Sequence, residues 1–325
     1  MSNSEKFEVY VADEVEEQFE LCGESTPYLQ SRALREEQMA TLGKDAELLS
    51  GMRRRALGHV IMSAISLIWS QTISPACPQK IWFDSMHMCD IVAARGLTFG
   101  NQATSCVMAV LRILSKAEDA RCILSSHHLS TLTELLRRRC VAAQPALPDD
   151  IDSAERSILR CLGWQIGFPS IHSWLSAFLS RLRVLAKSRL MAQEPDVGAV
   201  LTQLWQQSYT LGAAVVMHVA PIGWLAPRSL AMGLLGLGCA RVGVLPLRDA
   251  RPEWIGAAGW EQVYVRAMGP VPEPRAGSDA VKVTQAIQLA TDSSMAAVRD
   301  ACGRVALVVP DVNVLMLGAR ELVAV

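Results

Sequence analysis

The sequence has few aromatic residues, no excess of charge of either sign and no pair of closely spaced cysteines. Aromatic residues make up 6% of the chain and charged residues 19%, whereas half of all residues are hydrophobic. Lys and Arg number 31 against 32 Asp and Glu, so the net charge is -1. General nucleic-acid binding needs a basic face that releases phosphate counterions. The charge balance therefore argues against a nucleic-acid partner.

The cysteines do not form a disulfide or metal-binding pattern. Nine are scattered as single residues, none of them in a C-x-x-C pair. An odd number of isolated cysteines in a chain of 325 residues is typical of a reduced, intracellular compartment. The acidic segment Met1 to Glu24 lacks a continuous apolar core and is not expected to be a signal peptide.

No uninterrupted apolar run is long enough for a membrane span. The most hydrophobic stretch, Leu211 to Leu247, is divided by five residues: His218, Pro221, Pro227, Arg228 and Arg241. A spanning helix needs about 20 consecutive apolar residues. A buried helix is therefore favoured over a transmembrane one, and no membrane partner is expected.

The sequence also lacks the motifs of an enzyme. It has no glycine-rich phosphate loop and no recognisable nucleophile and base pair. Cys122, His127, His128 and Cys140 are the best candidates for a metal site, but their spacing matches no standard zinc finger. We expect no metal, no cofactor and no catalytic residue.

Helical periodicity dominates what is present, and it predicts an all-α protein. Apolar residues recur at i, i+3 and i+4 between Leu57 and Ile68, which indicates one buried stripe. The segment Ala103 to Leu114 is apolar around nearly its whole circumference, as in a helix at the centre of a bundle. Together with three further segments it predicts five helices, the third of them central. The three further segments are Trp82 to Gly96, Leu129 to Cys140 and Ile151 to Leu162.

A similar pattern recurs later in the chain, which indicates an internal duplication. Leu230 to Ala240 is again apolar on every side, and Gly233, Gly236 and Gly238 would allow neighbouring helices to approach closely. The other predicted helices of this second set are Ile171 to Ala186, Val197 to Val216, Pro252 to Ala258 and Trp260 to Met268. Three prolines then mark a linker after Gly269, followed by a predicted helix from Val281 to Cys302 and a β-like run from Val305 to Leu317.

These patterns predict four regions. Residues 1–47 form an acidic segment and a helix, and residues 48–168 form the first five-helix repeat. Residues 169–269 form the second repeat, and residues 270–325 form a linker and a tail of uncertain structure and unknown role.

Several short motifs follow one another in an order that resembles the cyclin family. The stretch Ala154 to Ser170 is similar to the cyclin signature at the end of the fifth helix, and Leu114 to Asp119 is similar to the end of the third. Met52-Arg53-Arg54 opens the first helix as in D-type cyclins, and Asp90 occupies the place of a family aspartate. Leu225 to Leu230 and Pro252 to Trp254 match motifs of the second repeat. The resemblance covers about residues 48–269 and implies two tandem cyclin-fold repeats.

The resemblance implies a non-catalytic regulatory subunit that binds and activates a cyclin-dependent protein kinase, located in the nucleus or cytoplasm. In that family a lysine and a glutamate hydrogen-bond the kinase, and Lys116 and Glu155 match them. The resemblance places Ile113, Ala117, Leu159 and Ile166 in the apolar contact around this pair. It also implies a buried ion pair between Arg53 and Asp90. The apolar substrate-docking patch, represented by Met52 and Leu57, is weakened because Arg54, Arg55 and Ala56 replace part of it.

Two alternatives remain open from the residues alone. The chain could be a cyclin-fold scaffold or a transcription-associated protein that binds partners without activating a kinase. Lys116 and Glu155 could also be purely structural. The helix dipole favours a lysine in a last turn, and a glutamate three residues after Asp152 resembles a helix-start arrangement.

Overall fold

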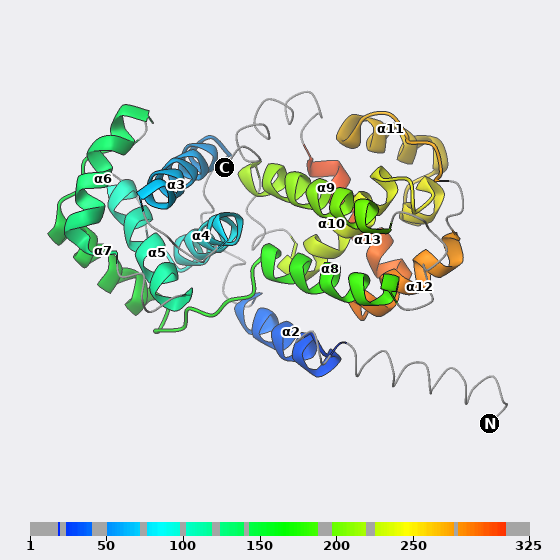
Figure 1. Ribbon diagram of the computed structural model, residues 1–325, viewed down its shortest axis with the longest axis horizontal. Helices are drawn as coiled ribbons and strands as arrows, with labels where there is room; N and C mark the ends of the chain where they lie inside the picture. The colour runs from blue at the N-terminus through cyan, green and yellow to red at the C-terminus, as the bar shows by residue number, and fades with distance from the viewer. Residues whose placement is uncertain are drawn as a thin grey trace. The chain divides into compact units, whose positions relative to one another are not determined.

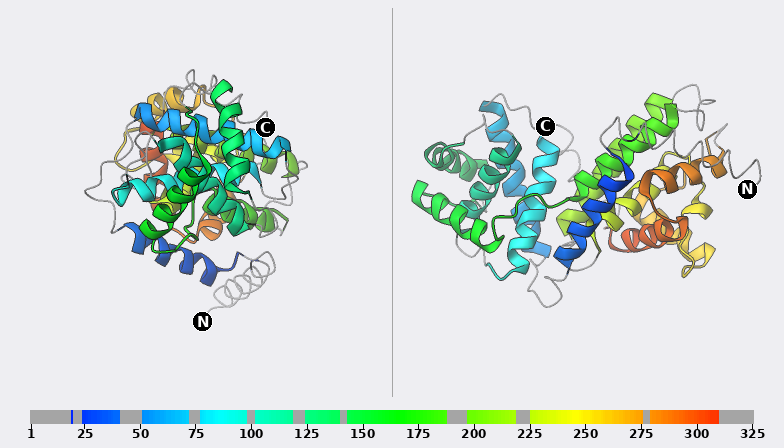
Figure 2. Two further views of the ribbon diagram at one scale, coloured as in Figure 1. Left: turned by 90° about the vertical axis from the view of Figure 1, so that its left-hand side faces the viewer. Right: turned by 90° about the horizontal axis from the view of Figure 1, so that it is seen from below.

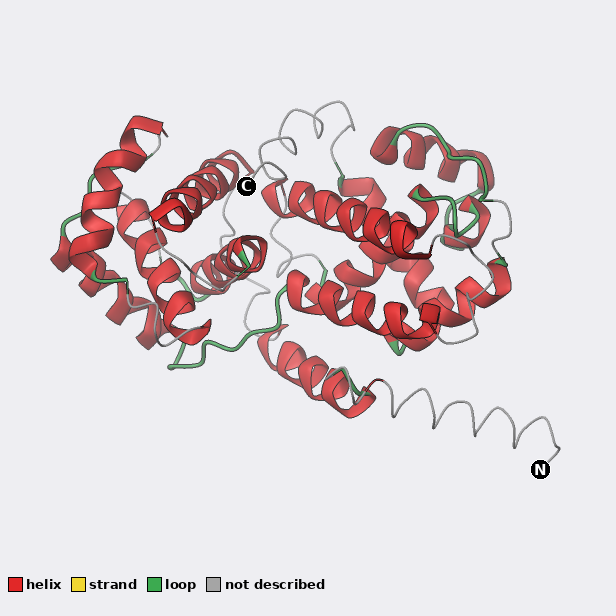
Figure 3. Ribbon diagram, viewed as in Figure 1, coloured by secondary structure: helices red, strands yellow, loops and turns green. Residues whose placement is uncertain are grey.

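The computed structural model describes residue 19 and residues 24–40, 51–71, 77–97, 102–118, 124–139, 143–187, 197–218, 225–275 and 279–309. All regular structure in these residues is helical, and they contain no strand (Figure 3). The predicted all-α class is therefore confirmed. The α-helices are α2 (Thr26–Ala40), α3 (Gly51–Gln71), α4 (Pro78–Ala94), α5 (Ala103–Glu118), α6 (Ser126–Arg139), α7 (Pro148–Cys161), α8 (Ile171–Lys187), α9 (Val197–His218), α10 (Pro227–Arg241), α11 (Ala257–Met268), α12 (Ala280–Thr291) and α13 (Met295–Val308).

The chain forms two compact units. The first, here called the α3–α7 unit, is built from Glu36–His172 and also takes in Ala213–Pro227. The second, the α8–α13 unit, contains α2 as far as Arg35, then Ser173–Gly212, and the chain from Arg228 through α13.

The α3–α7 unit contains the five helices predicted for the first half of the chain (Figure 1). Helix α5 contacts α3, α4 and α7, and α6 contacts α3 and α7. The side chains of α5 from Thr104 to Ser115 are all buried, as its apolar circumference predicts. The third helix of the set is thus the central one.

The α8–α13 unit differs from the predicted second set of five helices. The expected separate helix at Pro252 to Ala258 is absent: residues 252–256 are not helical, Ala257 and Ala258 begin α11, and a short 3-10 helix, Leu247–Ala250, precedes this segment. The long helix predicted from Val281 is two helices, α12 and α13, because the chain adopts a left-handed conformation at Asp292 (φ 50°). The prediction of a β-like run is wrong from Val305 to Val308, which are helical, and at Val309, which is a bend; residues 310–317 lie outside the described residues. The structure therefore does not confirm two five-helix repeats.

Close approach of α10 and α13 makes the C-terminal helices part of the core. A Cβ atom at Gly233 would lie 2.6 Å from the carbonyl oxygen of Ala301, and one at Gly236 would lie 2.5 Å from Cys302 Sγ. Val298 and Val305 are fully buried on the same helix. The glycines of α10 thus allow a neighbouring helix to approach, as predicted, and the neighbour is the region expected to be a tail.

Helix α2 lies beside α8 (Figures 1 and 2), and polar side chains connect the two helices. Arg32 donates to the carbonyl oxygen of Ser173 at 3.2 Å, and Arg181 donates to Thr26 Oγ1 at 3.2 Å. The Arg181 guanidinium also lies 3.9 Å from the centre of the Phe19 ring. The predicted N-terminal helix therefore belongs to the α8–α13 unit up to Arg35.

The last turns of α9, from Ala213 to His218, belong to the α3–α7 unit. Arg54 Nε donates to the carbonyl oxygen of Val216 at 2.5 Å. Gly58 on α3 faces Met217, and a Cβ at this position would lie 2.3 Å from Met217 Sδ. The absence of a side chain at Gly58 thus leaves room for Met217, in the last turns of α9, to lie against α3. None of the described helices combines the length and the apolarity that crossing a bilayer requires.

Candidate functional site

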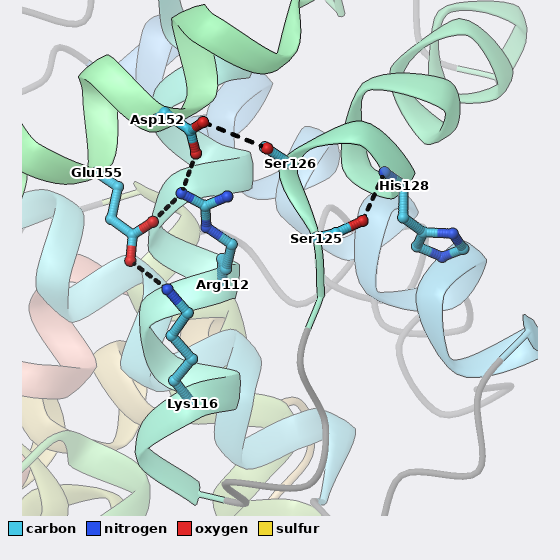
Figure 4. Close-up of polar contacts among 7 residues, drawn as sticks. All are labelled: Arg112, Lys116, Ser125, Ser126, His128, Asp152 and Glu155. Carbon is cyan, nitrogen blue, oxygen red and sulfur yellow. Dashed lines mark hydrogen bonds and ion pairs between the residues drawn. The ribbon is translucent and has the colours of Figure 1, made fainter.

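Four charged side chains meet between α5 and α7, and we call them the α5/α7 ion cluster: Arg112, Lys116, Asp152 and Glu155 (Figure 4). Lys116 Nζ lies 2.7 Å from Glu155 Oε1. Arg112 Nη2 lies 2.6 Å from Asp152 Oδ1 and also bonds to Glu155 Oε2. The cluster brings together the two residues, Lys116 and Glu155, that the sequence singled out.

Helical spacing explains why the four side chains meet. Arg112 and Lys116 are one turn apart on α5, and Asp152 and Glu155 are three residues apart on α7, so each pair lies on one helix face. Helix α6 adds a further contact, because Ser126 Oγ donates to Asp152 Oδ2 at 3.4 Å. The start of α6 is fixed by Ser125, whose hydroxyl accepts from the backbone N–H of His128 at 3.1 Å.

The members of the cluster differ in their exposure to solvent. The Glu155 side chain is 11% exposed, whereas the Lys116 side chain is 45% exposed. Partial burial lowers the pKa of Lys116; the Arg112 charge lowers it further, and Asp152 opposes both. An ammonium group carries three N–H donors, and Glu155 takes one of them. Lys116 therefore has donors left for an external acceptor, whereas Glu155 is largely committed within the chain.

The apolar residues predicted around this pair occupy different environments. Ile113 is buried in the core, with 3% of its surface exposed. Ala117 is exposed beside Lys116, and Leu159 and Ile166 are partly exposed. Three of the four predicted apolar contact residues are thus accessible to a partner, and Ile113 acts as a core residue.

Glu155 is not a helix-start residue. Helix α7 begins at Pro148, and the carboxylate that serves its first turn is that of Asp150. The backbone N–H of Leu147 donates to Asp150 Oδ2 at 3.2 Å. The helix-start interpretation of Glu155 is therefore wrong. Its carboxylate bonds to Arg112 and Lys116 instead.

Asp90 forms a fully buried ion pair, but its partner is Arg54 rather than the predicted Arg53. Arg54 donates through Nη2 to Asp90 Oδ2 at 2.8 Å and through Nη1 to Oδ1. The Arg53 side chain lies outside the described residues. Burial raises the pKa of Asp90, and the Arg54 guanidinium opposes this rise. Loss of either partner would leave a buried charge unpaired and would cost about 3–5 kcal/mol.

Within the described residues, the docking patch expected on α3 exposes little apolar surface. Leu57 is buried (6% exposed), and the Met52 side chain lies outside the described residues. Arg54 points into the core, so of the arginines thought to replace apolar surface only Arg55 is exposed. Leu57 thus provides no accessible apolar surface.

Arg112 is the site residue that sequence reasoning missed. Arg112 lies within the otherwise apolar segment of α5, whose apolar residues predict burial and give no reason to expect a functional charge there. A signal was present, because an isolated charge on a central helix needs a buried counter-charge. Asp152 and Glu155 on the fifth helix were available as that counter-charge.

The described residues contain no group of His, Cys, Asp and Glu arranged to hold a metal ion. Cys122 and Cys140, two of the four metal candidates in the sequence, lie outside these residues. No family model and no curated protein matches the chain. Fold and site together define an all-helical protein with a partly exposed ion cluster between two of its helices.

Proposed function

We propose that the chain is a cyclin-type regulatory subunit that binds and activates a cyclin-dependent protein kinase through the α5/α7 ion cluster. One observation carries the proposal. Lys116 and Glu155, singled out because each lies in a cyclin-like motif, are 39 residues apart in the sequence and only 2.7 Å apart in space. The five-helix arrangement around a central α5 supports the same function.

The geometry suggests how such a subunit would act without performing chemistry itself. Lys116 has spare N–H donors, and exposed Ala117 beside it leaves room for an approaching backbone. In protein kinases a glutamate on the regulatory C helix must pair with the lysine that positions ATP. Binding at that helix would hold it in the position that permits this pair. Charge-assisted hydrogen bonds from Lys116 would supply both affinity and orientation.

The alternative function is a cyclin-fold scaffold or transcription-associated protein that binds partners without activating a kinase. The burial of Glu155 favours this alternative, because both of its carboxylate oxygens already accept bonds within the chain. In that case the cluster would mainly hold α5 against α7. The two functions therefore differ in whether Lys116 contacts a partner.

The test mixes the purified chain with a panel of purified cyclin-dependent kinase catalytic subunits and measures both complex formation and phosphorylation of a peptide substrate. We expect one of these kinases to bind and to gain activity. Lys116→Met should weaken that complex by about 1.5–3 kcal/mol, the range for hydrogen bonds to charged groups.

Arg138→Met provides the matched control, since it removes an exposed cation from α6 in the same unit. It should leave binding and activation unchanged. Kinase binding without activation would support the scaffold function. No association with any cyclin-dependent kinase would contradict the proposal.

A further inference from the structure

Helix α7 carries four carboxylates and two arginines. Two of the carboxylates, Asp152 and Glu155, bond to Arg112 and Lys116 of α5. Its arginines, Arg156 and Arg160, are both exposed. The carboxylates Asp152 and Glu155 are thus balanced by cations of α5, and the two arginines take no part in that balance.

Arg156 and Arg160 are one turn apart, and neither forms an ion pair with any residue in the described part of the chain. A third guanidinium, that of Arg95, lies at the end of the same helix, where Nη1 donates to the carbonyl oxygen of Cys161 at 2.6 Å. Three guanidinium groups thus lie on or at the end of the C-terminal half of α7. Neither Arg156 nor Arg160 is bound to a carboxylate of the described residues. Such a surface attracts a partner of negative charge.

An exposed tryptophan, Trp164, lies four residues after Arg160. Trp164 is 68% exposed, although tryptophan is usually well buried. Its backbone has a φ of 64°, a conformation that residues other than glycine rarely adopt, and its N–H donates to the carbonyl oxygen of Leu159 at 2.9 Å. The end of α7 thus fixes the backbone of a large aromatic residue whose side chain remains in solvent.

We infer that Arg156, Arg160 and Trp164 form a docking surface for an acidic peptide segment of another protein that also carries an apolar side chain. Charge complementarity selects the acidic residues, because the two arginines have no carboxylate partner among the residues that the structure describes. Trp164 provides apolar area for a neighbouring leucine or similar residue. Arginine and tryptophan are the residues most enriched among binding hot spots. This inference uses none of the residues of the α5/α7 ion cluster and does not depend on the kinase proposal.

A peptide is a better occupant than a nucleic acid. The chain is neutral overall, with a net charge of -1, so it lacks the extended basic surface that tracks a phosphate backbone. Two arginines and one tryptophan match a short segment instead.

The test measures fluorescence anisotropy of a labelled peptide of glutamates with one central leucine, titrated with the full chain at low salt. We expect binding that weakens as sodium chloride is raised. The double substitution Arg156→Glu and Arg160→Glu should lower the affinity by about tenfold or more. The control is Arg137→Glu with Arg138→Glu, which makes the same charge change on exposed arginines of α6 and should have little effect.

A double-mutant cycle tests the aromatic part of the surface. Trp164→Asn, chosen because asparagine tolerates a positive φ, is combined with a peptide in which serine replaces the leucine. We expect Trp164→Asn to weaken the leucine peptide several-fold and to have little effect on the serine peptide, since the cycle isolates the pairwise contact. Equal losses from both arginine pairs, no coupling in the cycle, or tighter binding of a single-stranded oligonucleotide through the same residues would each overturn the inference.

Discussion

Lys116 and Glu155 were matched to the same function, but the structure assigns them different physical roles. Glu155 is buried and accepts bonds from two cations, whereas Lys116 is half exposed and keeps donors for a partner. Loss of Glu155 would leave Arg112, itself buried, facing only Asp152. A loss of binding in a Glu155 variant can therefore arise from instability of the chain alone. Substitution of Lys116 is the better test of binding.

The first prediction follows from this difference and concerns stability in the absence of a partner. Glu155→Gln should lower the free energy of unfolding by about 1–3 kcal/mol, since a charged hydrogen-bond acceptor is lost at a buried site. Lys116→Met should change it by less than about 1 kcal/mol, the usual value of an exposed ion pair. Urea denaturation of both variants measures the difference, with Glu134→Gln in the surface pair with Arg137 as the control. A larger loss for Lys116→Met than for Glu155→Gln would contradict the assignment.

The second prediction concerns His172, which is buried beside the Phe83 ring at a centroid distance of 6.1 Å. Burial, and to a lesser extent the Lys80 charge, lowers the pKa of His172 from 6.5 to about 4. Between these two values the unfolded chain binds a proton that the folded chain does not, so stability falls as pH drops. At complete protonation the loss from this one residue would reach about 3 kcal/mol.

His172→Phe should therefore reduce the loss of stability between pH 7 and pH 4, because phenylalanine has nothing to protonate. Thermal or urea unfolding at several pH values measures this. His127→Phe, a change on the exposed face of α6, should leave the pH dependence as it is in the unmodified chain. An unchanged acid sensitivity in His172→Phe would show that other groups cause it.

At the scale of secondary-structure elements, the strongest periodic signals were the most reliable. Circumferential apolarity correctly identified α5 as central, because a helix without a polar face can only lie inside a bundle. Weak signals failed for local reasons. Backbone conformation at Asp292 divides one predicted helix into two, and nothing in that residue type alone dictates a left-handed turn. Around Pro252 the chain forms turns instead of a helix, which a proline in a weakly apolar segment permits.

The third prediction tests the helix crossing at Gly233. Gly233→Ala should destabilise the chain by about 1–3 kcal/mol, because the new methyl group would meet the backbone of α13, which cannot move aside as a flexible side chain does. Gly198→Ala, in the first turn of α9 where a new Cβ would meet no other part of the described chain within 4 Å, should be neutral or stabilising by up to about 1 kcal/mol. Equal stability of the two variants would show that α10 and α13 do not pack as described.

At the scale of the whole molecule, the fold class followed from composition and periodicity, whereas the assignment of the C-terminal region did not. Sequence order suggested a tail because residues 280–308 follow a proline-rich linker. Helix α13 nevertheless packs against α10 through Ala301, Cys302 and Val305, which come together only in three dimensions. The choice between Arg53 and Arg54 as the partner of Asp90 was similar. The rotation of α3 about its axis decides which arginine faces Asp90. The motif Met52-Arg53-Arg54 contains both arginines and does not fix that rotation.

The fourth prediction follows from the inclusion of α13 in the core. Val305→Asp should destabilise the whole α8–α13 unit by about 3 kcal/mol or more, since it places an unpaired charge in an apolar site. Leu307→Asp, two residues further along and 47% exposed, should change stability by less than about 0.5 kcal/mol. Circular dichroism during thermal unfolding compares them. If Val305→Asp unfolds at the same temperature as the unmodified chain, the C-terminal helices are not part of the core.

The division of α9 between the two units has a consequence for how the protein is made on the ribosome. Domains generally fold during synthesis in order from the N-terminus. Here α3 to α7 emerge first, yet the carbonyl group of Val216 that receives the Arg54 side chain, and the Met217 side chain that faces Gly58, belong to the end of α9. Those atoms leave the ribosome only after α8 and most of α9. The core of the nascent α3–α7 bundle therefore stays incomplete until the end of α9 has been synthesised. A pause in translation before residue 213 would prolong the period in which chaperones can bind that core.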